Sequence, residues 1–155
     1  MAIQNHLLTI YGHSTPEALL RADLSALEAL HIHQLLSPSR ANGTAAIFAD
    51  DEMTFTFSMH GALNYPFSKE VSSLDVELPD GADDVLYLQK LDQHLTTAVT
   101  SARADIAFYL AGVDTVRGDR YGRLALSREG VHNRDRMVLN VAKIQDIPIA
   151  LVMSG

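Results

Sequence analysis

One stretch of the sequence places carboxylates directly after an apolar segment of strand length. Residues 106–111 are almost entirely apolar, and the loop that follows contains Asp114 and Asp119. Two glycines in this region, Gly112 and Gly118, allow backbone conformations that other residues rarely adopt. A carboxylate just past the carboxyl end of a buried strand lies where open α/β sheets bind their ligands. Asp114 is therefore a candidate binding residue.

A structural role is the alternative for both aspartates. Each carboxylate could cap a turn, or could pair with one of three arginines in the same loop, Arg117, Arg120 and Arg123. The spacing of these residues is compatible with either role.

Two histidines, His31 and His33, are separated by one residue and lie far upstream of Asp114. Two imidazoles and a carboxylate can supply three zinc ligands and leave a fourth position for water. The chain has no cysteine, so any zinc has to be held by histidine and acidic side chains. The pair would share one face of a strand, but after a helix the side chains would point about 200° apart. Chance placement at a helix end is the alternative.

The loop around Asp114 resembles a known family. Residues 110–124 read Leu-Ala-Gly-Val-Asp-Thr-Val-Arg-Gly-Asp-Arg-Tyr-Gly-Arg-Leu. They are similar to the third zinc-ligand segment of the histone deacetylase superfamily, especially its bacterial branch of acetoin-utilisation and polyamine deacetylases. The resemblance implies that Asp114 is a carboxylate zinc ligand and that its neighbours shape the loop. These loop-shaping residues are Gly112, Gly118, Asp119, Arg120 and Gly122.

The resemblance is nearly continuous from Asn42 to Gly155, the C-terminal half of the family's catalytic domain. We expect residues 1–41 to form a divergent N-terminal segment with an amphipathic helix, and residues 42–155 to form a partial deacetylase-like α/β domain. Within the first segment, His33 stands at the histidine-ligand position of the family and His31 replaces an aspartate. The resemblance therefore implies a zinc ion held by Asp114, His33 and His31.

Further roles follow from the resemblance downstream of Asn42. The Ser58 hydroxyl and the Met59 carbonyl would help to hold a monovalent cation such as K⁺ near the zinc. Tyr65 and Phe67 would flank the aliphatic stem of the substrate in a channel. The alternative for Ser58 and Met59 is that they simply end a strand.

Start signals and apolar spacing predict four helices. They cover residues 16–31, residues 42–50, a stretch that begins at Asp83 and Asp84, and a stretch from the N-cap Ser127 to about Gln145. The last helix is expected to turn five charged side chains to solvent: Arg128, Arg134, Asp135, Arg136 and Lys143.

Strands are predicted over residues 54–60, 106–111 and 147–153, whereas residues 72–81 are expected to form a loop. The apolar run at residues 7–11 could be an edge strand or a frayed end. Alternation of helices and strands indicates an α/β fold with a mainly parallel sheet between helical layers. The resemblance implies the three-layer, arginase/deacetylase-like version of this fold, here truncated.

Composition narrows the range of partners. The 155 residues suit one domain, and 12 basic against 19 acidic residues give a net charge of −7. This charge does not favour binding to nucleic acid or to an anionic membrane, and it is compatible with a cationic substrate. No signal peptide or membrane span is recognisable, so we expect a cytoplasmic protein.

The resemblance implies a zinc-dependent hydrolase that removes acetyl groups from acetyl-lysine or acetyl-polyamine. The family also uses two adjacent histidines and a tyrosine after the last strand. The sequence contains no adjacent histidine pair, and it ends at Gly155, before that tyrosine. We therefore expect an incomplete catalyst. The alternative is a non-catalytic homologue that acts as a binding or self-associating module, because a cut sheet exposes a strand edge and favours homo-oligomers.

Overall fold

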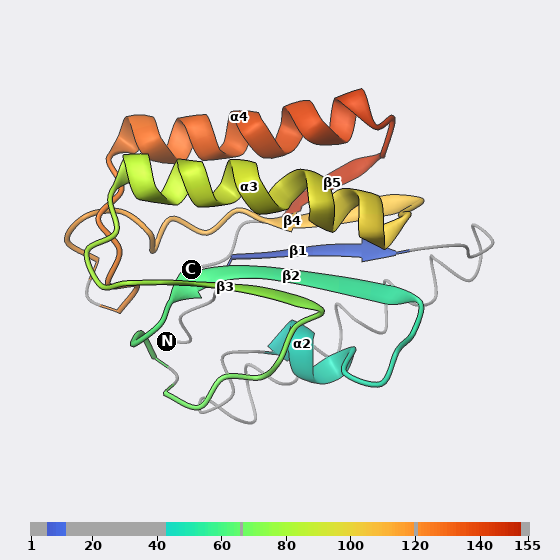
Figure 1. Ribbon diagram of the computed structural model, residues 1–155, viewed down its shortest axis with the longest axis horizontal. Coiled ribbons are helices and arrows are strands. Elements are labelled where there is room, and N and C mark those ends of the chain that lie inside the picture. Colours follow the sequence, from blue (N-terminus) through green and yellow to red (C-terminus); the bar gives the residue numbers. More distant parts are fainter. Residues whose placement is uncertain (1–5, 12–42, 66, 120, 153–155) are drawn as a thin grey trace.

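The computed structural model describes residues 6–11, 43–65, 67–119 and 121–152 of the chain. Its strands form one five-stranded sheet in the order β3-β2-β1-β4-β5 (Figure 1). The strands are β1 (His6–Tyr11), β2 (Thr54–Gly61), β3 (Leu74–Leu78), β4 (Ile106–Leu110) and β5 (Ile149–Val152). The described helices are α2 (Gly43–Ile47), α3 (Asp84–Ala102) and α4 (Arg128–Ile144).

The sheet is mixed, because β1 runs antiparallel to both of its neighbours. β2 pairs in parallel with β3, and β4 pairs in parallel with β5. These four strands therefore share one direction, and their carboxyl ends meet at one edge of the sheet. The apolar run near the N-terminus forms the central strand β1, so the expectation of an edge strand or a frayed end is wrong.

A second expectation also needs correction. Residues 72–81 were expected to form a loop, but Leu74–Leu78 is strand β3 at one side of the sheet. In this segment Val76 and Leu78 are buried and Glu77 between them is exposed. An alternation of this kind is typical of a strand with one face on a core.

Helices α3 and α4 start where the sequence predicts. The Asp83 carboxylate accepts a hydrogen bond from the Leu86 amide (3.1 Å), and the Ser127 hydroxyl accepts one from the Gly130 amide (3.0 Å). Each cap satisfies an amide that would otherwise lack a partner in the first turn. The helix predicted at residues 16–31 lies outside the described residues.

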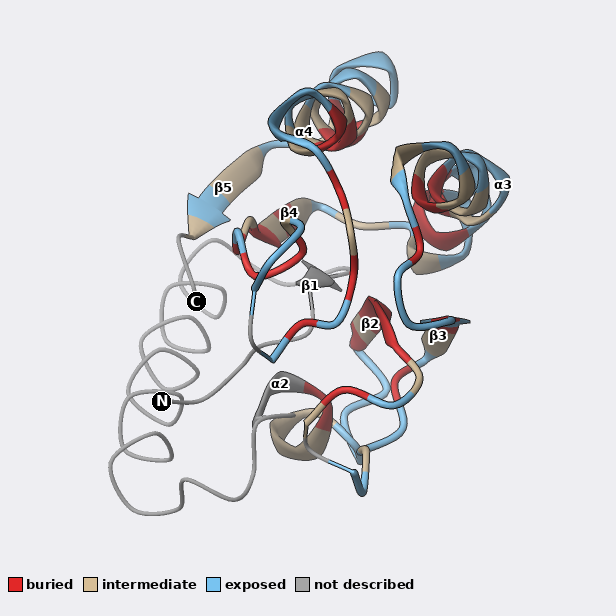
Figure 2. Ribbon diagram, turned by 90° about the vertical axis from the view of Figure 1, so that its left-hand side faces the viewer, coloured by how far each residue is buried: buried red, intermediate tan, exposed pale blue. Residues whose placement is uncertain are grey.

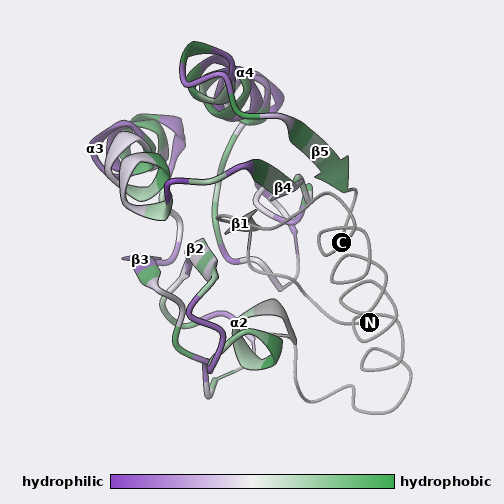
Figure 3. Ribbon diagram, turned by 90° about the vertical axis from the view of Figure 1, so that its right-hand side faces the viewer, coloured by the Kyte–Doolittle hydropathy of each residue, from purple (hydrophilic) through white to green (hydrophobic). Residues whose placement is uncertain are grey.

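Both long helices cover one face of the sheet (Figure 2). The core lies between them and the sheet, and it includes Phe57, Met59, Tyr87, Leu91, Leu95, Tyr109 and Val138. Green apolar segments of β4 and β5 and of the helices are visible in Figure 3. α2 lies on the other side of the sheet and has only five residues. Within the described residues, the expected second helical layer is therefore not shown.

The charged face of α4 differs from the expectation at Arg134 and, in part, at Asp135, whose side chain is 32% exposed. Arg128, Arg136 and Lys143 are exposed, but the Arg134 side chain is only 1% exposed. Arg134 is spaced four residues from the buried Gly130 and from Val138, so it belongs to the helix face that packs inward. The expectation that Arg134 faces solvent is wrong.

None of the helices in the described ranges has both the length and the apolar character needed to cross a lipid bilayer.

Candidate functional site

The loop after β4 crosses the edge of the sheet where the parallel strands end. The Gly81 amide, just beyond β3, donates to the Arg123 carbonyl (2.7 Å), and the Ala125 amide donates to the Ala82 carbonyl (2.9 Å). A parallel bridge joins Val116 to Leu126 within the same loop. Residues 111–119 and 121–127 are therefore held against the segment that links β3 to α3. This edge is where open α/β sheets bind ligands.

Asp114 lies in this loop, four residues beyond the end of β4. It is only 9% exposed, and the neighbouring Thr115 is buried. The Thr115 carbonyl accepts a hydrogen bond from the Leu126 amide (3.1 Å), and the Val116 amide donates to the Val113 carbonyl (3.1 Å). Main-chain bonds on both sides thus hold the backbone around a largely buried carboxylate.

Asp119 has the turn-capping geometry that was the alternative to a ligand role. Its Oδ1 accepts hydrogen bonds from the Tyr121 and Gly122 amides, both at 2.8 Å. Among the loop arginines, Arg123 pairs with Asp80 at 3.0 Å on the surface. Arg120 lies outside the described residues.

Gly122 is packed between two main-chain segments. A Cβ atom at this position would overlap the carbonyl oxygen of Asp114. The Gly122 carbonyl in turn lies 3.1 Å from the position that a Cβ on Gly61 would take, at the end of β2. Gly118 has a φ of +91° and open space around it, so there the requirement for glycine is conformational. The two loop glycines therefore serve different purposes.

Arg134 reaches the same loop from helix α4. Its Nη1 donates to the Gly112 carbonyl (2.9 Å) and to the Thr115 hydroxyl (3.2 Å), on either side of Asp114. Its Nε donates to Asp135 Oδ1 (2.8 Å), and its Nη2 lies 2.7 Å from the same oxygen. Asp135 Oδ1 also accepts from the Tyr109 hydroxyl (2.6 Å). A buried network thus joins the loop, α4 and β4.

Burial and charge act together on the ionisable groups of this network. Burial lowers the pKa of Arg134, but Tyr109, Tyr87 and Asp135 outweigh this effect and leave the pKa raised. For the tyrosines burial acts in the opposite direction: it raises the pKa of Tyr87 to about 12, and it also raises the pKa of Tyr109. Arg134 is therefore a cation and both tyrosines are neutral at physiological pH.

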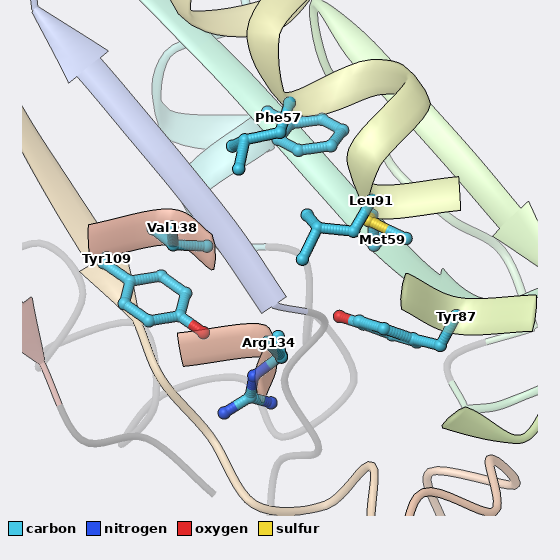
Figure 4. A pocket seen from close by; sticks show the side chains of 8 residues that line it. Phe57, Met59, Tyr87, Leu91, Tyr109, Arg134 and Val138 are labelled. Carbon is cyan, nitrogen blue, oxygen red and sulfur yellow. The ribbon is translucent and has the colours of Figure 1, made fainter. Parts of the chain in front are cut away.

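A small cavity of about 20 Å³ lies between the sheet and the two long helices (Figure 4). It is lined by Phe57, Met59, Tyr87, Leu91, Leu95, Tyr109, Arg134 and Val138. A cavity of this size has room for about one water molecule. It is too small to accept a substrate side chain, so it belongs to the core.

The two residues considered for a monovalent cation lie within strand β2, close to its end at Gly61. The Ser58 hydroxyl lies 2.9 Å from Nδ1 of His60, and both side chains are buried. Desolvation of the ring lowers the pKa of His60 and so favours its neutral form. The Met59 side chain points toward the core cavity (Figure 4), and only its main chain could serve a cation. The monovalent cation site stays a prediction.

The two aromatic residues considered for a substrate channel lie in the loop after β2. The rings of Tyr65 and Phe67 pack edge to face, with centroids 6.2 Å apart and planes at 85°. Phe67 is 80% exposed. Tyr65 is half-buried, so it is mainly the exposed Phe67 ring that offers apolar surface to a ligand. The channel role is still a prediction.

The described residues do not by themselves make a zinc site. In the ranges that the structure covers, no three side chains of His, Cys, Asp or Glu lie close enough together to hold a metal ion. Of the implied ligands, Asp114 is described, whereas His31 and His33 lie outside the described residues. The zinc site formed by Asp114, His31 and His33 therefore stays a prediction.

The contact of Arg134 with the Asp114 loop was not predicted from the sequence, although the spacing of Arg134 along its helix indicated a buried position. Gly130, Arg134, Val138 and Ala142 recur every fourth residue and are all buried. This periodicity places Arg134 on the inward face of the helix. A charged residue in an apolar stripe indicates a buried partner, and here the partners are Asp135 and the Asp114 loop.

The fold and the Asp114 loop together define an α/β domain with a largely buried carboxylate after strand β4. Residues 40–155 match the family described as the histone deacetylase domain, and the chain belongs to this family. It is 44% identical over 126 residues to an uncharacterized protein of Picosynechococcus sp., and the match covers 81% of this chain and 40% of that protein. It is 30% identical over 123 residues to histone deacetylase 2 of Arabidopsis thaliana, with 77% and 32% covered.

The chain therefore spans less than half the length of these curated relatives. Family membership makes it a deacetylase-like protein.

Proposed function

We propose that this chain contributes the Asp114 loop to the site of a deacetylase that cleaves the amide bond of acetyl-lysine or acetylated polyamines. The observation that carries this proposal is the burial of the Asp114 carboxylate at the carboxyl edge of the sheet. Its loop is held by main-chain bonds within the loop, by bonds to the segment after β3 and by Arg134 of α4. We also propose that the protein belongs to the bacterial branch of acetoin-utilisation and polyamine deacetylases. Its proposed location is the cytoplasm.

Amide hydrolysis needs more than one carboxylate. It requires a group that polarises the carbonyl, an activated water, a base and a donor for the oxyanion. Because the sequence contains no adjacent histidine pair of the kind that the resembled family uses, we propose that the chain alone is an incomplete catalyst. Zinc would be bound by Asp114 together with His31 and His33 of this chain, or together with ligands supplied from elsewhere. The net charge of −7 favours the approach of cationic substrates.

The test is a zinc titration of the purified chain, monitored by calorimetry, together with a deacetylation assay on an acetyl-lysine peptide and an acetylated polyamine. Asp114→Asn keeps the shape of the side chain and removes its charge. Asp105→Asn, at the opposite end of β4, is the matched control. We expect weak zinc binding that is lost in Asp114→Asn and retained in Asp105→Asn. Equal zinc binding by the two variants would contradict a ligand role for Asp114.

A second candidate function is self-association. Strand β5 ends the described sheet order, its sequence is Ile-Ala-Leu-Val, and Leu151 is 55% exposed. An apolar strand with one unpaired edge is a template for pairing with another chain. We therefore propose, as the alternative function, that the chain forms a homodimer in which β5 of one copy pairs with β5 of the other. Light scattering after size exclusion tests it, and Leu151→Lys should shift the chain toward the monomer.

A further inference from the structure

Arg134 bonds to the main chain and side chain that flank Asp114. Its Nη1 donates to the Gly112 carbonyl two residues before Asp114 and to the Thr115 hydroxyl one residue after it. A single guanidinium nitrogen thus joins both sides of the turn. The guanidinium is in turn fixed by Asp135 through Nε and Nη2.

The geometry of this contact depends on arginine. The guanidinium is planar and presents donors in fixed directions, so it can bond to a carboxylate along one edge and to the loop along another. A lysine ammonium is a point charge and cannot reproduce both edges from one position. The Arg134 side chain is buried, so water does not compete for these bonds.

The network also connects the loop to the strand that precedes it. The Tyr109 hydroxyl, on β4, donates to the same Asp135 oxygen that receives Arg134. The Arg134 guanidinium carbon lies 5.9 Å from the centre of the Tyr109 ring. The two tyrosines and Arg134 lie close together in Figure 4. The position of the loop therefore depends on how α4 packs against β4.

We propose that Arg134 is a positioning residue that holds residues 112–115 in the conformation that presents the Asp114 carboxylate at the edge of the sheet. This inference deepens the proposed function, because it concerns the residue on which that function rests. Arg134 acts through the loop and takes no part in bond cleavage. The proposal assigns to α4 a role in the site beyond covering the sheet.

Hydrogen–deuterium exchange of the full chain tests this role. In Arg134→Lys we expect exchange of the amides of residues 112–118 to rise by about tenfold or more, as for one lost hydrogen bond to a charged group. Exchange within residues 94–102 of α3 should change much less, because Tyr87, the α3 residue that forms a hydrogen bond with Arg134, lies in the first turn of that helix. Arg136→Lys, an exposed arginine on the same helix, is the matched control and should leave both regions unchanged.

A second variant guards against the possibility that Arg134→Lys unfolds the chain. Thr115→Val keeps the shape of the side chain and removes one acceptor for Arg134. It should raise exchange in the loop alone, by less than Arg134→Lys does. The proposal is overturned if both variants leave loop exchange unchanged, or if exchange rises equally in the loop and in residues 94–102 of α3.

The zinc titration separates failure of this proposal from failure of the proposed function. If Asp114→Asn has no effect on zinc binding but Arg134→Lys still loosens the loop selectively, the metal role of Asp114 falls and the positioning role of Arg134 stands. If Asp114→Asn abolishes zinc binding and neither Arg134→Lys nor Thr115→Val alters the loop, the positioning role alone falls.

Discussion

The main chain of Asp114 occupies the space that a side chain at Gly122 would need. The Asp114 carbonyl oxygen lies where a Cβ on Gly122 would be, and the Gly122 amide is fixed by the Asp119 carboxylate at 2.8 Å. Backbone atoms cannot rotate away as the end of a long side chain can. The close approach of these two residues therefore couples the conformation of the loop to the position of Asp114.

Gly122→Ala should displace the main chain at Asp114. We expect a loss of about 1–3 kcal/mol in the free energy of unfolding, as for overpacking at a rigid site. Urea unfolding measures the loss, and amide chemical shifts of Thr115 and Val116 report the displacement. Gly118→Ala is the control, because its cost is the positive φ alone. Unchanged shifts at Thr115 in Gly122→Ala would contradict the coupling.

Asp84 and Ser127 join the N-termini of the two long helices. Asp84 accepts from the Ser127 amide (2.7 Å) and from its hydroxyl (2.6 Å). Ser127→Ala removes a helix cap together with this link, so we expect it to cost about 1–2 kcal/mol. Asp84→Ala should cost a similar amount, and the double variant should cost less than the sum because both variants remove the same link. Additive effects in urea unfolding would show that the link contributes nothing.

The buried tyrosines predict a loss of stability at high pH. The pKa of Tyr87 is raised from 10.0 to about 12 by burial. Between these values the unfolded chain releases a proton that the folded chain keeps. The free energy of unfolding should therefore fall as pH rises through this range, by up to about 1.4 kcal/mol per pH unit for each such tyrosine.

Tyr87→Phe should reduce this slope, and Tyr121→Phe, at an exposed position, should not. Denaturant unfolding at several pH values measures the slope, and tyrosinate absorbance follows the ionisation. Equal slopes in the two variants would contradict the assignment to Tyr87.

Val138 offers a test of the core cavity. It lines a space of about 20 Å³ between the sheet and the helices. Val138→Ile adds one methylene toward that space, and we expect a gain of up to about 1 kcal/mol from cavity filling. Val138→Ala enlarges the cavity and should cost about 2 kcal/mol. Thermal and urea unfolding measure both, and a loss in Val138→Ile would mean that the cavity cannot accept the methylene.

Several elements could be predicted because their signals are local. Asp83 and Ser127 are N-caps at the predicted starts of α3 and α4, and the strands predicted over residues 54–60 and 106–111 are β2 and β4 within one residue. A cap depends on atoms only three residues away, and a continuous apolar run forms a strand largely by its own burial.

Strand pairing could not be predicted in the same way. β1 pairs with β2 and β4, whose residues lie more than forty positions away in the sequence. No local pattern indicates which distant strand becomes the partner, or whether the pairing is parallel or antiparallel. β3 is different, because the alternation of Leu74, Val76 and Leu78 was a readable strand signal. The proline and glycine that follow it favoured the interpretation as a loop.

The residue types and the order of elements by themselves determined the family, the helix caps and Asp114 as the carboxylate of interest. Only the tertiary structure decided that Arg134 is buried against the Asp114 loop and that Gly122 meets the main chain of Asp114. The physical reason is that burial and close approach depend on which distant segments pack together. A charge on a helix is solvated or buried according to the neighbour that the fold brings to it.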